Sequence, residues 1–125
     1  GWIALYNNSY YLRVQAQHPG GKLSFGTECW AYRTVSVTPN EVYLLNITGN
    51  GGVSNGNRFV KIMDTSGNVL HSQYDQQTAN LNLQVSGNVG ARSQVRIAIG
   101  VKTPGGDPAT NVNFQFNNVS LNHVP

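Results

Sequence analysis

The chain lacks the features that mark several common classes of protein. Its 125 residues include one cysteine, Cys29, so no internal disulfide can form. No apolar run approaches the roughly 18 to 20 residues that a membrane-spanning helix needs. No segment keeps helical periodicity for more than about two turns before Gly, Asn or Pro interrupts it. We therefore expect no disulfide scaffold, no membrane partner and no helical fold.

Charge is scarce as well. Lys, Arg, Asp and Glu make up 10% of the residues, and the formal net charge of +3 arises mainly because acids are few. The eight basic residues are scattered and form no stripe, so we expect no nucleic-acid partner. Asn and Gln together outnumber all charged residues. Solubility therefore rests on amides, hydroxyls and glycine.

Catalytic constellations are missing too. A glycosidase needs two carboxylates about 5 to 10 Å apart, and the five acids form no convincing pair: Glu28, Glu41, Asp64, Asp75 and Asp107. Residues 52–56 match the G-x-S-x-G nucleophile elbow, but a glycine loop precedes them and a strand follows, whereas the elbow needs a strand before it and a helix after it. The three histidines have no metal-ligand spacing. We expect a protein that is not an enzyme.

What the chain does have is strict alternation of apolar and polar residues, with amides at most polar positions. In residues 79–85 the apolar face holds Leu81, Leu83 and Val85, and the opposite face holds Asn80, Asn82 and Gln84. Residues 94–101 and 112–116 repeat the pattern, with Gln94 and Arg96 on the polar face of the first and Asn113 and Gln115 on that of the second. An amide is both a donor and an acceptor, which suits a neutral, hydroxyl-rich ligand. The pattern points toward carbohydrate.

Short strands separated by Gly, Asn and Pro predict one all-β domain over residues 1–125. We expect strands at 2–6, 10–16, 22–25, 29–37, 41–48, 58–63, 68–73, 79–85, 92–101 and 112–121. Such a chain favours a two-sheet antiparallel β-sandwich, a jelly roll, with an up-and-down barrel as the competing geometry. Asn7-Asn8 predicts a turn, and the jump in apolar phase from Phe116 to Val119 predicts a β-bulge at Asn117-Asn118.

The apolar faces of these strands predict the core. Its members are Ile3, Leu5, Leu12, Val14, Val35, Val37, Leu44, Val60, Ile62, Leu81, Leu83, Val95, Ile97, Phe114, Phe116 and Leu121.

Two aromatic residues and one arginine are the sharpest candidates for binding. Trp30 and Tyr32 share the face opposite Val35 and Val37, where they would stack on sugar rings, although a tryptophan that caps the core fits the pattern equally well. Arg96, flanked by Gln94, can bridge vicinal hydroxyls or a uronate carboxylate. The alternative for Arg96 is a salt bridge or cross-strand cover.

Four segments in order resemble family 4/9 carbohydrate-binding modules, which are jelly-roll domains appended to secreted glycoside hydrolases. They are residues 11–14, 34–43, 58–64 and 112–121, which look like the early strand, the "vtv-pG-tY" passage, the strand after it and the terminal strand of the family. The chain departs from the family at Asn40, at Asn117, where the family has aspartate, and in lacking the family's opening strand before Trp2.

The resemblance implies a non-catalytic module that targets a parent enzyme to a β-linked plant-type polysaccharide, xylan or β-glucan. It further implies an extracellular protein, monomeric as a module of a larger chain. No cofactor is required, but the family often holds a structural calcium, for which Asp107 is the candidate ligand here. The rival hypothesis is a structural or adhesive jelly roll of a viral fibre, capsid or cell-surface adhesin, in oligomeric form, because low charge and abundant amides suit β assemblies too.

Overall fold

A computed structural model describes residues 3–15, 28–50, 57–75, 81–102 and 111–125, and every regular element within these ranges is a strand. The eight strands are β1 (Ile3–Gln15), β2 (Glu28–Ser36), β3 (Val42–Asn50), β4 (Asn57–Met63), β5 (Val69–Tyr74), β6 (Leu81–Asn88), β7 (Gln94–Lys102) and β8 (Asn111–His123). No helix long and apolar enough to span a bilayer occurs in this part of the chain.

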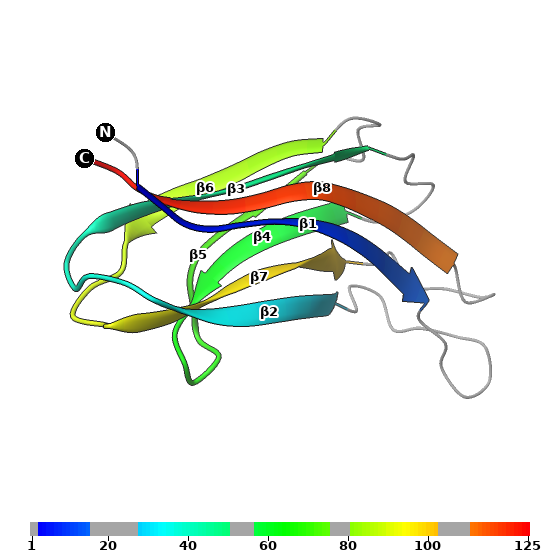
Figure 1. Cartoon of the computed structure of the whole chain (residues 1–125). Coiled ribbons are helices and arrows are strands. Elements are labelled where there is room, and N and C mark those ends of the chain that lie inside the picture. The colour runs from blue at the N-terminus through cyan, green and yellow to red at the C-terminus, as the bar shows by residue number, and fades with distance from the viewer. Residues whose placement is uncertain (1–2, 16–27, 51–56, 76–80, 103–110) are drawn as a thin grey trace.

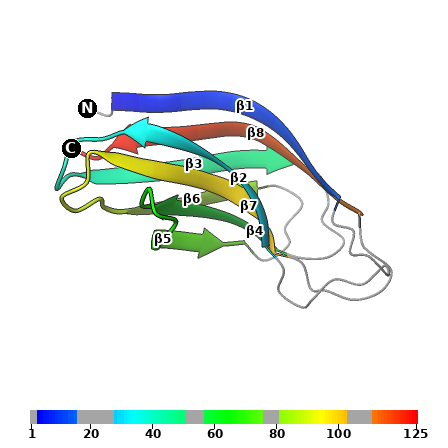
Figure 2. The same ribbon diagram turned by 90° about the horizontal axis from the view of Figure 1, so that it is seen from below.

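The strands form two four-stranded antiparallel sheets that face each other (Figures 1 and 2). One sheet has the order β1-β8-β3-β6 and the other the order β2-β7-β4-β5. The predicted sandwich is therefore confirmed, and the barrel is wrong. Strands β6 and β7 follow each other in the chain but belong to different sheets, which decides where the candidate site residues lie.

The core fills the space between the sheets, and seven of the thirteen residues in its buried cluster were predicted. The buried cluster consists of Val37, Tyr43, Leu45, Ile47, Val60, Ile62, Leu83, Val89, Val95, Ile97, Ile99, Val119 and Leu121, with Val35, Leu70 and Val85 packed against it. The prediction that Leu44 belongs to the core is wrong, because Leu44 lies on the outer side of β3 and is only half-buried. Two apolar phases compete along β3, and the longer one, Tyr43, Leu45 and Ile47, faces inward.

Two further expectations concern the local course of the chain. The turn at Asn7-Asn8 is wrong, because β1 runs unbroken through these residues and pairs with β8, with register shifts before Tyr6 and before Tyr10. The bulge is confirmed: the β3–β8 register steps from Thr48–Asn118 to Gly49–Phe116, which leaves Asn117 as the extra residue. The predicted strand at 22–25 lies outside the described residues.

Candidate functional site

The outer surface of the β2-β7-β4-β5 sheet carries rings and cations in ordered cross-strand rows. Strand alternation puts Val95, Ile97 and Ile99 of β7 in the core and the residues between them on the outside. The pairing register sets Trp30, Gly100, Phe59 and Tyr74 in one row, Tyr32, Ala98, Lys61 and Ser72 in the next, and Thr34, Arg96 and Met63 in a third. We call this side of the sheet the aromatic face. Its residues are Trp30, Tyr32, Phe59, Lys61, Tyr74, Gln94 and Arg96, of which Phe59 and Lys61 are buried.

Trp30 and Tyr32 are the exposed rings of this face. Their exposed fractions are 47% and 53%, so a tryptophan that caps the core is wrong. Their strand neighbours on β7 are Gly100 and Ala98, which have little or no side chain. Long side chains from β2 and β4 can therefore approach each other across β7. Planar rings exposed on a rigid strand are suited to stacking against a flat ligand.

Two cations lie against these rings. The Cζ atom of Arg96 is 4.5 Å from the centroid of the Tyr32 ring. The Nζ atom of Lys61 lies 4.6 Å from the ring of Phe59, 5.6 Å from that of Tyr74 and 5.9 Å from that of Trp30. Both distances to β2 are within the range of cation–π attraction. These contacts favour a fixed orientation of the two exposed rings.

Arg96 has no acceptor for its N–H groups among the residues that the structure describes. Its Nε atom is shielded from solvent and makes no hydrogen bond there. Arg96 therefore forms no salt bridge with any described carboxylate, which was one alternative role for it. The other alternative, packing against a neighbouring strand, is confirmed, because the guanidinium lies over the ring of Tyr32 on β2. Gln94 is exposed two residues away on the same side of β7.

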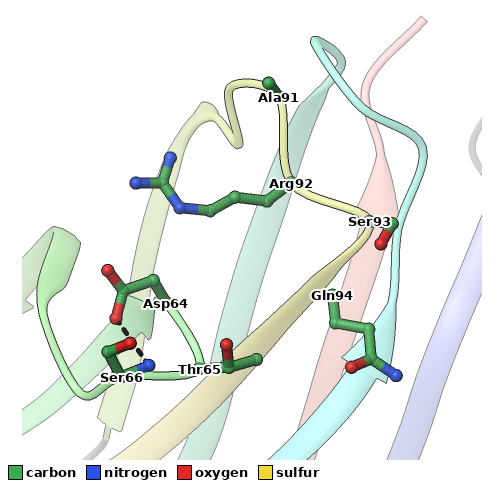
Figure 3. Close-up of a pocket in the computed structure, with 7 residues that line it drawn as sticks. All are labelled: Asp64, Thr65, Ser66, Ala91, Arg92, Ser93 and Gln94. Carbon is green, nitrogen blue, oxygen red and sulfur yellow. Dashed lines mark hydrogen bonds between the residues drawn. The ribbon is translucent and has the colours of Figure 1, made fainter.

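The aromatic face ends at a hollow between the β4–β5 turn and the β6–β7 loop (Figure 3). Its volume is about 380 Å³, and Asp64, Thr65, Ser66, Ala91, Arg92, Ser93 and Gln94 line it. Gln94 belongs both to the hollow and to the face, so the two are continuous. The lining offers hydroxyls, an amide and a guanidinium, which are groups that bind polar ligands.

A carboxylate holds the β4–β5 turn in shape. Oδ1 of Asp64 accepts hydrogen bonds from the backbone N–H of Ser66 at 2.9 Å and of Asn68 at 2.8 Å, while Oδ2 accepts one from the Asn68 amide at 2.9 Å. The hydrogen bond from the Asn68 side chain, followed by the one from its backbone, lowers the pKa of Asp64 below 3.8, its ordinary value. Asp64 is thus charged at neutral pH and already engaged within the turn.

The predicted amides divide between the two sheets. Asn82 and Gln84 are exposed on β6 and lie on the outer side of the β1-β8-β3-β6 sheet, away from the aromatic face. Together with Asn46, Thr48, Asn118, Ser120 and Asn122 they form a surface that we call the amide face. Within it the Asn46 amide donates to Oδ1 of Asn82 at 3.1 Å.

The remaining predicted residues are placed only in part. Asn113 and Gln115 lie on β8, where their backbones pair with Arg13 and Tyr11 of β1, and the structure does not describe their side chains. Asn80 and Asp107 lie outside the described residues. The fold brings Trp30, Tyr32, Gln94 and Arg96 together on one side of a sheet, whereas Asn82 and Gln84 lie on the other sheet.

Sequence reasoning missed the contributions of Phe59, Lys61 and Arg92. Strand β4 is apolar on both faces, with Phe59 and Met63 on one and Val60 and Ile62 on the other, so alternation gave no reason to place Lys61 near Trp30. Within the described ranges no group of three or more His, Cys, Asp or Glu side chains could hold a metal ion. The calcium prediction depends on Asp107 and is not tested.

Comparison of the fold with solved structures finds carbohydrate-binding modules. The chain is similar to the family 6 module from Cellvibrio mixtus lichenase 5A in complex with cellotriose, with a TM-score of 0.55 and 13% identity over 98% of this chain and 100% of that one. It is also similar to the second family 16 carbohydrate-binding module, with a TM-score of 0.52 and 20% identity over 89% of this chain and 84% of that one.

A third similar structure belongs to a larger enzyme. It is an arabinose-bound α-L-arabinofuranosidase, with a TM-score of 0.52 and 14% identity; the match covers 98% of this chain and 23% of that one. No family model matches the chain, and no curated protein matches it. At these identities the comparisons define the fold, which is the β-sandwich of carbohydrate-binding modules, and the resemblance to family 4/9 stays a prediction.

Proposed function

We propose that this domain is a non-catalytic carbohydrate-binding module that attaches a parent protein to a β-linked polysaccharide such as xylan or β-glucan outside the cell. The observation that carries the proposal is the pair of exposed rings, Trp30 and Tyr32, side by side on a rigid sheet and backed by cations. Aromatic rings cover the C–H faces of sugars, while the guanidinium of Arg96 and the amide of Gln94 bind hydroxyls.

The binding free energy that such a site can supply agrees with a targeting role. A ring contact contributes about 0.5 to 1.5 kcal/mol beyond the area it buries, and a neutral hydrogen bond contributes about 0.5 to 1.5 kcal/mol net. Two rings with a few hydrogen bonds correspond to dissociation constants of roughly micromolar to millimolar. Such affinity retains a protein on a polymer with many sites.

Gel electrophoresis in the presence of soluble xylan or β-glucan tests the proposal. We expect the polymer to retard the wild-type protein and the Trp30→Ala variant to lose on the order of tenfold in affinity with a nearly unchanged melting temperature. Val69→Ala is the matched control, because Val69 has the same exposed fraction, 47%, and lies on β5 at the other edge of the sheet. Equal retardation of the two variants would contradict the proposal. Failure of every polymer to retard the wild-type protein would contradict it as well.

The rival function, a structural or adhesive jelly roll, makes a different prediction about assembly. The neutral amide face would serve it as an interface between subunits. Sedimentation of the isolated domain distinguishes the two: a stable trimer favours the rival, and a monomer that polysaccharide retards favours the module.

A further inference from the structure

We infer that the aromatic face prefers a polysaccharide that carries carboxylate groups, and that Arg96 binds the carboxylate of a uronic-acid residue. The inference rests on the proposed function and names the ligand class of the same surface. Two observations carry it: the missing acceptor at Arg96 and the orientation of its guanidinium.

The first observation is that Arg96 presents donors with no protein acceptor. A guanidinium has five N–H groups and no acceptor of its own. None of the described residues accepts a hydrogen bond from Arg96, and its Nε is shielded from water. An acceptor that a ligand brings can therefore bind the guanidinium without displacing a partner among the described residues.

The second observation is that the guanidinium is already oriented. It lies over the ring of Tyr32, with Cζ 4.5 Å from the ring centroid. Stacking restricts the side chain, so less conformational entropy is lost when a ligand binds. The planar fork of a guanidinium matches a carboxylate through two parallel hydrogen bonds, which a single sugar hydroxyl cannot accept.

The acids whose side chains the structure places are engaged elsewhere: Asp75 contacts Arg58, Asp64 holds its own turn and Glu41 contacts His123. None of these carboxylates therefore competes with a ligand for Arg96.

The hollow beside Arg96 can take the rest of such a sugar. Gln94 lies two residues along β7 from Arg96, roughly 7 Å away in an extended strand. It lines the hollow together with the hydroxyls of Thr65, Ser66 and Ser93 (Figure 3). These groups bind sugar hydroxyls, while the guanidinium binds the carboxylate.

Calorimetry with two matched probes tests the inference: neutral xylo-oligosaccharides and the same oligosaccharides with one glucuronic-acid branch. We expect the wild-type protein to bind the acidic probe about tenfold more tightly, as a charge-assisted pair predicts. Arg96→Gln should bind both probes equally, and Arg96→Lys should keep only part of the preference, because an ammonium lacks the fork. Arg33→Gln removes an exposed charge from the same sheet, on the opposite side of β2, and should keep the full preference.

The outcomes separate this inference from the proposed function. Equal binding of both probes by the wild-type protein overturns the uronate inference and leaves the module intact. A preference that Arg33→Gln lowers as much as Arg96→Gln also overturns it, because diffuse charge would then be the cause. No binding of either probe also overturns the uronate inference, and the gels with β-glucan then decide the proposed function separately. A preference lost in Arg96→Gln, with Trp30→Ala weakening both probes to the same extent, supports both.

Discussion

The imidazole ring of His71 lies directly against the α-carbon of Gly87, so closely that a β-carbon at Gly87 would overlap the ring. His71 is on β5 and Gly87 is on β6, which are edge strands of different sheets. The Nε2 atom of His71 is also 2.9 Å from the carbonyl oxygen of Asn88. One side chain thus joins the two sheets at their edge, and glycine is the residue that makes room for it.

The first prediction follows from this contact. Gly87→Ala should lower the free energy of unfolding by about 1 to 3 kcal/mol, because the added methyl forces the ring out of its place. Urea denaturation measures the change. In the double variant His71→Ala, Gly87→Ala the ring is absent, so the loss should be smaller than the sum of the single losses. Additive losses would show that the ring and the glycine do not interact.

The second prediction concerns the buried ion pair at the start of β4. The Arg58 guanidinium contacts Oδ2 of Asp75 through Nε at 3.0 Å and Nη2 at 2.9 Å, and Oδ1 accepts a hydrogen bond from the Arg58 backbone at 2.7 Å. Asp75→Ala would leave a buried charge without this partner and should cost about 3 to 5 kcal/mol of unfolding free energy.

An exposed carboxylate–histidine contact supplies the control for that variant. Oε2 of Glu41 lies 3.2 Å from Nε2 of His123, so Glu41→Gln should cost at most about 1 kcal/mol by the same denaturation assay. A loss at Asp75 no larger than the loss at Glu41 would contradict the structural role of the buried pair.

The third prediction concerns the loss of folding stability at acidic pH. The hydrogen bonds of the β4–β5 turn lower the pKa of Asp64 in the folded state below 3.8, its ordinary value, so the unfolded state binds the proton more readily. The contribution of Asp64 is therefore complete above pH 3.8 and is lost as the pH falls from there through the folded pKa. Asp64→Asn should flatten this part of the curve of melting temperature against pH.

Carboxyl NMR measures the same pKa directly. Asn68→Ala removes the largest cause of the shift, so the pKa of Asp64 should rise toward its ordinary value in that variant. An unchanged titration would show that the Asn68 side chain does not stabilise the carboxylate.

The fourth prediction separates the two outer surfaces. One oligosaccharide bound on the aromatic face cannot also touch the amide face, because the sheets of a sandwich are about 10 Å apart and the two surfaces point away from each other. Asn82→Ala and Gln84→Ala should therefore leave the affinity for xylan or β-glucan unchanged, whereas Tyr32→Ala should lower it. Affinity gels with each variant provide the measurement. If Gln84→Ala abolished binding while Tyr32→Ala did not, the binding site would lie on the amide face instead.

Much of the fold could be predicted from the sequence because it follows from local pattern. Period-two alternation identified the strand that contains Gln94 and the inward position of Val95 and Ile97. Phe116 and Val119 are both apolar but three residues apart, which breaks the period-two alternation. This break identified the bulge, since one extra residue is the simplest way to restore alternation. The error at Leu44 arose where both faces of β3 are apolar, and there alternation has two solutions.

The candidate site was predictable only in its parts. Alternation showed that Trp30 and Tyr32 share one side of their strand and that Gln94 and Arg96 share one side of another. The stacking of Arg96 on Tyr32 and the reach of Lys61 toward Trp30 depend on the pairing of β2 with β7 and of β4 with β7. Pairing between segments that are distant in the chain has no local signal.

The amino-acid order by itself decided that this is an all-β chain, which residues of each strand point together and where one strand bulges, because side-chain alternation and backbone preference act over a few residues. Only the tertiary structure decided that β6 joins one sheet and β7 the other, which places the amides of β6 and the guanidinium of Arg96 on opposite sides of the molecule. The reason is that a strand's alternation determines which side faces the core, whereas the choice of sheet depends on long-range hydrogen bonding and on the packing of the whole core.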